Sequence, residues 1–324
     1  MLEACGLTAA GERPALTPLK GGVSSEIFRI DLPAGPVCAK RALRRLKVAQ
    51  DWFAPVERSE AEVAWIQTVQ SIHPSAAPRL IAADSSHHGF VMAYLDPGQY
   101  PCWKDSLRDG AIDPLFARTV GEVIGRIHAR TARNGDIAAA FPNQALFEVL
   151  RMEPYLRATA TRHPDLAGRL NELAETTLGT RFALVHGDVS PKNILQGPEG
   201  PVFLDSECAC YGDPAFDLAF CLNHLLLKSV WRPQWRDRYM LCFESLFAGY
   251  VDQIDWERPA VLEARAAGLL SALLLARVDG KSPVEYITTD VQKAYVRRIS
   301  RRFIAEPADE LGEISDAWRE GIAE

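Results

Sequence analysis

The sequence has little that would favour a nucleic acid or a membrane as a partner. Its formal net charge is −6, and its basic residues form only local clusters, such as the one from Lys40 to Lys47. Binding to a phosphate backbone needs a basic surface, so we expect no nucleic-acid partner. The most apolar long window, Ala266 to Ala276, is far shorter than the roughly 20 residues that span a bilayer. It predicts a buried helix, and we expect no membrane partner.

Targeting and disulfide signals are also lacking. The N-terminal residues have no basic segment followed by an apolar core, which a signal peptide would show. The seven cysteines are odd in number and scattered, a pattern typical of reduced thiols. We therefore expect a cytoplasmic protein. With 324 residues, 48% hydrophobic and 24% charged, the chain is ordinary for a globular protein, and its length allows two moderate lobes.

The first structural pattern is a hairpin with a glycine-rich tip. Residues Leu16 to Ile30 predict two strands joined by a turn that contains Gly21, Gly22 and Ser24. Backbone N–H groups in such a tip can approach a nucleotide phosphate. A Gly-Gly pair is also a common turn signal, so the hairpin alone does not decide between the two interpretations.

A lysine strand and a helix with several glutamates follow. Residues Pro36 to Leu43 predict a short strand that contains Lys40, and Pro55 to Val69 predict a helix. Lys40 follows the hairpin at the distance where a nucleotide-binding lobe places its phosphate-pairing lysine, although a lone strand lysine is more often exposed. One helix carboxylate facing the sheet could pair with Lys40. The candidates are Glu57, Glu60 and Glu62.

The pattern changes after a second strand pair. Residues Pro78 to Ala83 and Gly89 to Leu95 predict strands, and Asp96-Pro97-Gly98 is a strong breaker. We place the lobe boundary there, with an N-terminal lobe over residues 1–95 and a C-terminal lobe over residues 96–324. The second lobe is predicted to be mainly helical. Its helices are expected from Pro114 and over Ala145 to Leu156, Leu166 to Leu178, Arg236 to Val251 and Pro259 to Val278, before a charged stretch from Val291 to Arg302.

Two short loops after apolar strands carry the residues suited to phosphoryl transfer. Asp188 follows the strand Phe182 to Val185 and could accept a proton from an attacking hydroxyl, while Asn193 could coordinate a metal ion through its amide oxygen. Asp205 ends the next strand, where its carboxylate could bind Mg²⁺. Glu207 would lie on the same side of an extended chain and could reach a second ion.

Each of these residues alone has an ordinary structural explanation. Asp188 could form a turn, Asn193 could cap a loop, and the segment from Asp205 to Glu207 could be a solvated strand end. The combination is much harder to obtain by chance. It consists of H-G-D-x-x-x-x-N from His186 to Asn193, a strand that ends D-x-E, and G-D-P-x-x-D-L-A from Gly212 to Ala219.

With these motifs the sequence resembles the aminoglycoside phosphotransferase/choline kinase superfamily, which has the protein-kinase-like fold. The resemblance implies an α+β, two-lobed protein-kinase-like fold, with a small antiparallel β-sheet lobe containing one main helix and a larger, mostly helical lobe. It covers roughly residues 16 to 225. The features look closest to methylthioribose kinase and its relatives. That kinase has glycine and serine where this chain has Lys192 and Asn193, so methylthioribose is one candidate acceptor among several.

The resemblance also implies roles for individual residues. Lys40 would pair with nucleotide phosphates, with Glu62 as its partner and Glu57 or Glu60 as alternatives. The tip residues Gly21, Gly22 and Ser24 would cover the nucleotide, and Met92 to Leu95, including Tyr94, would be the hinge at the adenine. Asp188 would be the catalytic base and Lys192 would add positive charge. Mg²⁺ would be held by Asn193, Asp205 and Glu207. Asp217 would fix the catalytic loop, and Asp213 would cap the following turn.

The implied activity is an ATP- and Mg²⁺-dependent kinase acting on a hydroxyl of a small molecule. A non-catalytic nucleotide-binding module that regulates a partner is the alternative, and a protein kinase is disfavoured because HGD replaces HRD. The acceptor and the oligomeric state stay open. Basic residues after the last motif could favour an anionic or neutral sugar, whereas an acidic rim would suit a cationic amine. Candidate acceptor residues are Asn223, His224, Lys228, Trp231, Trp235 and Arg236.

Overall fold

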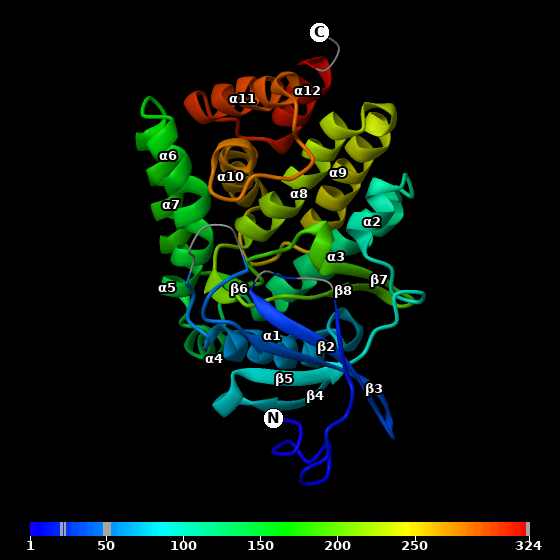
Figure 1. Ribbon diagram of the computed structural model, residues 1–324. Helices are drawn as coiled ribbons and strands as arrows, with labels where there is room; N and C mark the ends of the chain where they lie inside the picture. The colour runs from blue at the N-terminus through cyan, green and yellow to red at the C-terminus, as the bar shows by residue number, and fades with distance from the viewer. Residues whose placement is uncertain (20–21, 23, 48–52, 322–324) are drawn as a thin grey trace.

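Alternating apolar residues build the N-terminal lobe around one antiparallel sheet (Figure 1). The computed structural model describes residues 1–19, 22, 24–47 and 53–321. In this part of the chain the sheet has five strands in the order β1-β2-β3-β5-β4. The strands are β1 (Leu16–Pro18), β2 (Ser25–Leu32), β3 (Gly35–Ala42), β4 (Leu80–Asp84) and β5 (Gly89–Ala93).

One helix packs against this sheet. Helix α1 (Arg58–Ile72) lies along the strands in Figure 1 and contacts β3, β4 and β5. Trp65 and Val69 on α1 are fully buried, so their apolar surface joins the sheet to the second lobe. A short 3₁₀ turn, η1 (Pro74–Ala76), links α1 to β4, and another, η2 (Ser85–His87), links β4 to β5.

Helices dominate the C-terminal lobe. Helix α8 is its centre, since every residue from Pro214 to Val230 is buried, and it packs against α9 and α10. The longer helices are α3 (Pro114–Thr131), α7 (Ala167–Gly179), α8 (Pro214–Trp231), α9 (Arg236–Val251), α10 (Pro259–Asp279), α11 (Asp290–Ala305) and α12 (Leu311–Gly321). The shorter ones are α2 (Trp103–Arg108), α4 (Gly135–Ala140), α5 (Gln144–Phe147), the π-helix η3 (Glu148–Arg157), α6 (Ala158–Arg162) and the 3₁₀ turn η5 (Pro233–Trp235).

Two small two-stranded sheets hold the loops next to the N-terminal lobe. One pairs β6 (Ala183–Val185) with β9 (Cys210–Gly212), and the other pairs β7 (Ile194–Gly197) with β8 (Gly200–Phe203). The 3₁₀ turn η4 (Pro191–Asn193) precedes β7. The loop from His186 to Asn193 therefore runs between one sheet and the other, and both of its ends are anchored by strand pairing.

Several predicted elements are confirmed. The hairpin forms with Leu16 opposite Ile30, the Lys40 strand is β3, and α9 has the predicted bounds Arg236–Val251. The apolar window from Ala266 lies in α10. By length and composition alone α10 could cross a membrane, but 67% of its most apolar window is buried inside the fold, as the prediction of a buried helix requires.

One helix prediction is wrong in detail, and one helix was not predicted. The segment Ala145 to Leu156 was expected to be one helix, but α5 ends at Phe147 and a π-helix follows. Pro154 lies inside this π-helix, and a proline cannot donate the backbone hydrogen bond that a regular α-helix needs there. In addition, no helix was predicted over Pro214–Trp231, where the structure has α8. This helix is buried on all sides, so its sequence has no regular polar face that would mark an amphipathic helix. The boundary between residues 95 and 96 stays a prediction.

Candidate active site

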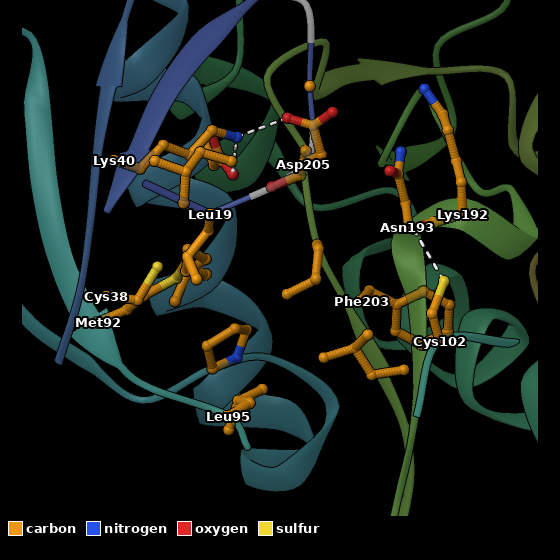
Figure 2. A pocket seen from close by; sticks show the side chains of 18 of the residues that line it. Leu19, Cys38, Lys40, Met92, Leu95, Cys102, Lys192, Asn193, Phe203 and Asp205 are labelled. Atoms are coloured by element: carbon orange, nitrogen blue, oxygen red, sulfur yellow. Dashed lines mark hydrogen bonds and ion pairs between the residues drawn. The ribbon is translucent and has the colours of Figure 1, made fainter. Parts of the chain in front are cut away.

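A cavity of about 500 Å³ lies between the β-sheet lobe and the helical lobe (Figure 2). From the sheet its lining includes Ile27 and Lys40, and from the helical lobe it includes Leu195 and Phe203. The predicted hinge also lines it, with Met92 and Tyr94 among the residues from 92 to 95. The cavity combines an apolar part near Met92 and Leu95 with a polar end at Lys40, Asp205, Asn193 and Lys192.

Lys40 forms the polar end of the cavity together with two carboxylates. Its Nζ lies 2.8 and 2.7 Å from the two carboxylate oxygens of Glu62 and 2.5 Å from Oδ1 of Asp205. Glu62 is buried, whereas Glu60 is exposed. The structure therefore gives Lys40 the partner Glu62, and not Glu57 or Glu60.

The charges of this cluster do not cancel, since one ammonium group faces two carboxylates. Burial opposes the charge on Lys40, but Asp205 and Glu62 outweigh it and raise the pKa of Lys40. Burial raises the pKa of Glu62 to about 7 against the opposing effect of Lys40. For Asp205, burial is outweighed by Lys40 and Lys192, which lower its pKa. Asp205 therefore stays ionised. The negative charge of the two carboxylates exceeds the positive charge of Lys40, so a further cation could be bound here.

The predicted catalytic loop, residues 186–193, is fixed by the buried carboxylate of Asp217. Asp217, on the first turn of α8, accepts the backbone N–H groups of His186 at 2.7 Å and Gly187 at 2.8 Å. Gly187 has φ +81°, and a Cβ atom there would lie 2.8 Å from Cys208 Cβ, so this turn requires glycine. His186 Nδ1 accepts the N–H of Asp188 at 3.1 Å. The supporting role predicted for Asp217 matches its two contacts.

Asp188 lies at the end of this turn and is held by two cations. Its Oδ2 is 3.1 Å from Arg151 and 3.2 Å from Lys192 Nζ, and the side chain is almost fully buried. Burial alone would raise the pKa of Asp188, but Lys192 and Arg151 reverse the direction and lower it. The carboxylate is therefore ionised and oriented, as a group that accepts or aligns a hydroxyl proton must be.

Asn193 and Asp205 could hold a divalent cation. The Nδ2 of Asn193 donates to the backbone oxygen of Asp188 at 3.1 Å, which leaves its Oδ1 for a ligand. Figure 2 shows both side chains facing the same space. Among the described residues no group of three His, Cys, Asp or Glu side chains could hold a metal ion. An amide oxygen and one carboxylate fit Mg²⁺, which is commonly bound by few protein ligands together with substrate phosphates.

Glu207 does not lie where the strand pattern predicted. Strand β8 ends at Phe203, and Asp205 has φ +67°, so the chain is not extended here and the two-residue alternation fails. Instead Glu207 Oε2 accepts Nε of Arg58 at 2.9 Å. The extended chain on which the prediction for Glu207 rested is therefore absent, and its carboxylate has a buried partner of its own. A metal-binding role for Glu207 stays a prediction.

The glycine-rich tip is only partly described. Gly22 lines the cavity and has φ +66°, whereas Gly21 lies outside the described residues. Ser24 is buried, and its backbone oxygen accepts a hydrogen bond from Arg58 at 2.5 Å. Ser24 therefore anchors the base of the hairpin to α1, and its side chain does not line the cavity.

Two arginines of the site were not anticipated. Arg58 is 1% exposed and joins the hairpin, β3 and α1 to Glu207, and Arg151 reaches Asp188 from the π-helix. Arg58 precedes Glu62 by one helical turn, which places both on one face and could have indicated its role. Arg151 gives no such signal, because its position depends on the irregular helix around Pro154.

The predicted class is confirmed by comparison with known proteins. Residues 15–262 match the family described as "Phosphotransferase enzyme family". This match covers more than half of the chain, so the protein belongs to that family. The fold and the arrangement of Lys40, Asp188 and Asp205 agree with this membership, and the family is one of small-molecule kinases.

Individual relatives differ strongly in sequence. The chain is 25% identical over 280 residues to methylthioribose kinase of a Geobacillus species, with 78% of this chain and 68% of that enzyme covered. It spans only 51% of methylthioribose kinase 1 of Oryza sativa. Among solved structures, amicoumacin kinase in complex with AMP-PNP, Ca²⁺ and its ligand has a TM-score of 0.57 at 14% identity, with 96% and 94% of the chains covered. Plasmodium vivax ethanolamine kinase also has a TM-score of 0.57 at 14% identity, with 93% and 85% covered. These structures share the fold.

Proposed function

We propose that this protein transfers the γ-phosphoryl group of ATP, in an Mg²⁺-dependent reaction, to a hydroxyl group of a small molecule. The observation that carries the proposal is the convergence on one loop region of the Lys40–Glu62 pair, the Asp205–Asn193 pair and the ionised Asp188. These side chains come from four segments of the chain, namely β3, α1, the loop from His186 to Asn193, and the segment after β8. A structural role alone does not account for so many buried charges at one cavity.

The nucleotide would occupy the 500 Å³ cavity in a defined direction. Its adenine ring would lie at the apolar end, against Met92 and Phe203 and next to the backbone of residues 92–95. Its phosphates would lie at Lys40, whose ammonium group Glu62 orients, near Gly22. Mg²⁺ would be held by Asp205 and Asn193, where it would neutralise charge that develops on the phosphate oxygens.

Asp188 would act on the acceptor. The acceptor oxygen forms the new bond to the γ-phosphorus while the bond from that phosphorus to the β–γ bridging oxygen breaks, so ADP leaves with the bond's electron pair. The hydroxyl proton passes to the Asp188 carboxylate. Lys192, which contacts Asp188 at 3.2 Å and is half exposed, is placed to balance negative charge on the transferring group. Arg151 contacts the same oxygen, Asp188 Oδ2, at 3.1 Å.

The test combines nucleotide binding with a screen for acceptors. We expect ADP in the presence of Mg²⁺ to bind the purified protein in a calorimeter and to bind much more weakly without Mg²⁺. A coupled assay of ADP release would then compare sugars, sugar acids, amino alcohols and aminoglycosides, with methylthioribose included because of the relatives' names. Asp188→Asn is the blank, and product is confirmed by mass spectrometry.

The outcomes separate the proposal from its alternative. A phosphorylated product that depends on Asp188 supports the kinase. Tight nucleotide binding with no transfer to any acceptor would favour the non-catalytic nucleotide-binding module, and no nucleotide binding would exclude both. We also propose a cytoplasmic location, which the seven free cysteines and the use of ATP support.

A further inference from the structure

A second cavity adjoins the nucleotide cavity. Its volume is about 670 Å³, and Cys102, Lys104 and Asp105 line both cavities. Cys102 Sγ also lies 3.6 Å from the backbone oxygens of Pro191 and Lys192, which belong to the catalytic loop. The second cavity therefore borders the loop that carries Asp188. Its other lining residues are Arg108, Lys228, Trp231, Glu285, Tyr286 and Thr288.

Lys228, in the last turn of α8, is the unusual residue of this cavity. Its side chain is 1% exposed, and within the described chain its Nζ has no hydrogen-bond or ion-pair partner. Its contacts are the faces of two aromatic rings, Tyr286 at 4.7 Å and Trp231 at 5.3 Å. Such contacts offset only part of the cost of removing an ammonium group from water. A bound anion would supply the ion-pair partner that Lys228 lacks among the described residues.

The carboxylates nearby are already paired with other cations. Glu285 Oε1 lies 2.5 Å from Lys104 Nζ, and Asp105 Oδ1 lies 2.7 Å from Arg108. Two acidic and three basic side chains therefore line the cavity, and Lys228 is the cation in excess. A cationic ligand would meet this excess charge, whereas an anion would neutralise it.

A buried histidine lies next to Lys228 on the same helix. His224 lies one helical turn before Lys228, and its Nδ1 is 3.3 Å from the Tyr286 hydroxyl. Burial lowers the pKa of His224 well below its usual value, and the cations Arg277, Lys228, Lys192 and Lys104 lower it further. His224 is therefore neutral, and its buried Nε2 has no partner within the described residues. His224 lines neither cavity, so Lys228 is the buried, unpartnered side chain at the second cavity itself.

We propose that this cavity is the acceptor site and that Lys228 binds an anionic group of the acceptor, a carboxylate or a phosphate. The inference rests on the proposed function and names the substrate class of the same active site, a hydroxylated anion such as a sugar acid or a sugar phosphate. The anionic group would lie at Lys228, the carbon chain would contact Trp231 and Tyr286, and a hydroxyl at the other end would reach Asp188.

The test uses acceptors that share a carbon skeleton and differ in charge. Glucose, gluconate, glucose 6-phosphate and glucosamine form one series, and ribose, ribonate and ribose 5-phosphate form a shorter one. With saturating MgATP, kcat/KM is expected to be at least tenfold higher for an anionic member than for its neutral counterpart. The carboxylate and phosphate arms show which anion is preferred. Higher kcat/KM for the neutral or cationic members would overturn the inference while leaving the kinase proposal intact.

Matched variants test the role of Lys228 itself. Lys228→Met is expected to raise the KM for the preferred anion at least tenfold, and Lys228→Arg to restore most of the affinity. Lys281→Met is the control, because Lys281 is exposed and pairs with Glu153 outside the cavity. An unchanged KM in Lys228→Met would mean that the lysine is only structural, which contradicts the proposal.

Direct binding keeps the inference independent of turnover. Gluconate, glucose 6-phosphate and glucose are titrated by calorimetry into the wild-type protein saturated with MgADP. A Kd for an anion at least tenfold lower than the Kd for glucose supports the site. This result does not depend on whether the Lys228→Met variant folds. If no anion binds more tightly than glucose, the inference is wrong, whereas the absence of MgADP binding would instead count against the proposed function.

Discussion

Asp205 Oδ1 lies 2.5 Å from Lys40 Nζ, and Lys40 also contacts both carboxylate oxygens of Glu62. Asp205 comes from the helical lobe and the other two residues from the sheet lobe. One lysine thus connects the lobes across the cavity. Binding of a metal ion and phosphates at Asp205 and Lys40 would replace the Lys40–Asp205 contact, while Glu62 would keep Lys40 in place.

Replacing Glu62 should weaken nucleotide binding much more than replacing Glu60. Glu62→Gln removes the charged partner of Lys40, and a hydrogen bond between charged groups contributes about 1.5–3 kcal/mol. We expect the Kd for MgADP to rise by roughly 10- to 100-fold. Glu60→Gln is the control, because Glu60 is exposed on the same helix. Calorimetric titration measures both, and equal effects would argue against the assigned pair.

Arg151 should control the pH dependence of activity through Asp188. The pKa of Asp188 is lowered by Lys192 and Arg151, so its carboxylate stays ionised to lower pH than usual. Arg151→Met removes one of these cations, and the acid limb of kcat/KM should move to higher pH by about one unit. Arg151→Lys should restore the position of the limb.

Arg157→Met is the matched control for this experiment, because Arg157 lies on the same π-helix but pairs with Glu148 and Glu175. The profiles are measured at saturating MgATP with the acceptor varied. An acid limb that does not move in Arg151→Met would show that Arg151 has only a structural role.

The buried pair of Arg58 and Glu207 should contribute to stability. Arg58 also donates to the backbone oxygens of Ser24 and Leu43, so its loss leaves several buried acceptors without a donor. Breaking a buried pair typically costs about 3–5 kcal/mol, and we expect Arg58→Met to lower the free energy of unfolding by this order. Urea denaturation measures it. Arg41→Met, which breaks the exposed pair with Glu26, should cost less than about 1 kcal/mol.

Close packing of two helices depends on Gly121 in α3. A Cβ atom at this position would lie 2.0 Å from the backbone oxygen of Leu246 in α9, so the helices would have to separate. Gly121→Ala should therefore destabilise the protein by about 1–3 kcal/mol. Gly168→Ala in α7 is the control, since nothing lies within 4 Å of its added Cβ. It should be neutral or stabilising by up to about 1 kcal/mol in the same denaturation experiment.

The affinity for an anionic acceptor should fall at alkaline pH, because Lys228 loses its positive charge there. Burial and the charge of Lys104 lower the pKa of Lys228 to about 8. Above this pH the amine loses its charge, so the KM for an anionic acceptor should rise as pH increases through 8. In Lys228→Arg the guanidinium keeps its charge, and this rise should disappear. The titratable groups around Lys228 are Cys102, Lys104 and Asp105 from the α2 side, Glu285 and Tyr286 from the segment before α11, and His224 on α8.

The same rise in the KM of the wild type and of Lys228→Arg would assign the titration to another of these groups. A neutral sugar serves as the reference acceptor, because its affinity should not follow the charge of Lys228.

Local sequence patterns predicted the elements that have a clear period or a fixed order of motifs. Strand alternation and breakers located the hairpin and the Lys40 strand, and the spacing from His186 to Asn193 predicted that Asp188 and Asn193 lie on one short loop. These features depend on residues close together in the chain. The local patterns gave wrong predictions where residues distant in sequence determine the backbone conformation. Examples are the π-helix around Pro154 and Asp205, which has a left-handed conformation.

By itself, the sequence determined the class of the protein and the order of its catalytic motifs, because short-range turn chemistry and hydrophobic period are encoded locally. Only the tertiary structure decided which glutamate pairs with Lys40, that Glu207 pairs with Arg58, and that Arg151 reaches Asp188. It also placed Lys228 beside the adjacent rings of Trp231 and Tyr286, with no ion-pair partner among the described residues. Except for Lys228 and Trp231, these contacts join residues far apart in the chain, and the free energy of such a contact depends on burial, which no local pattern specifies.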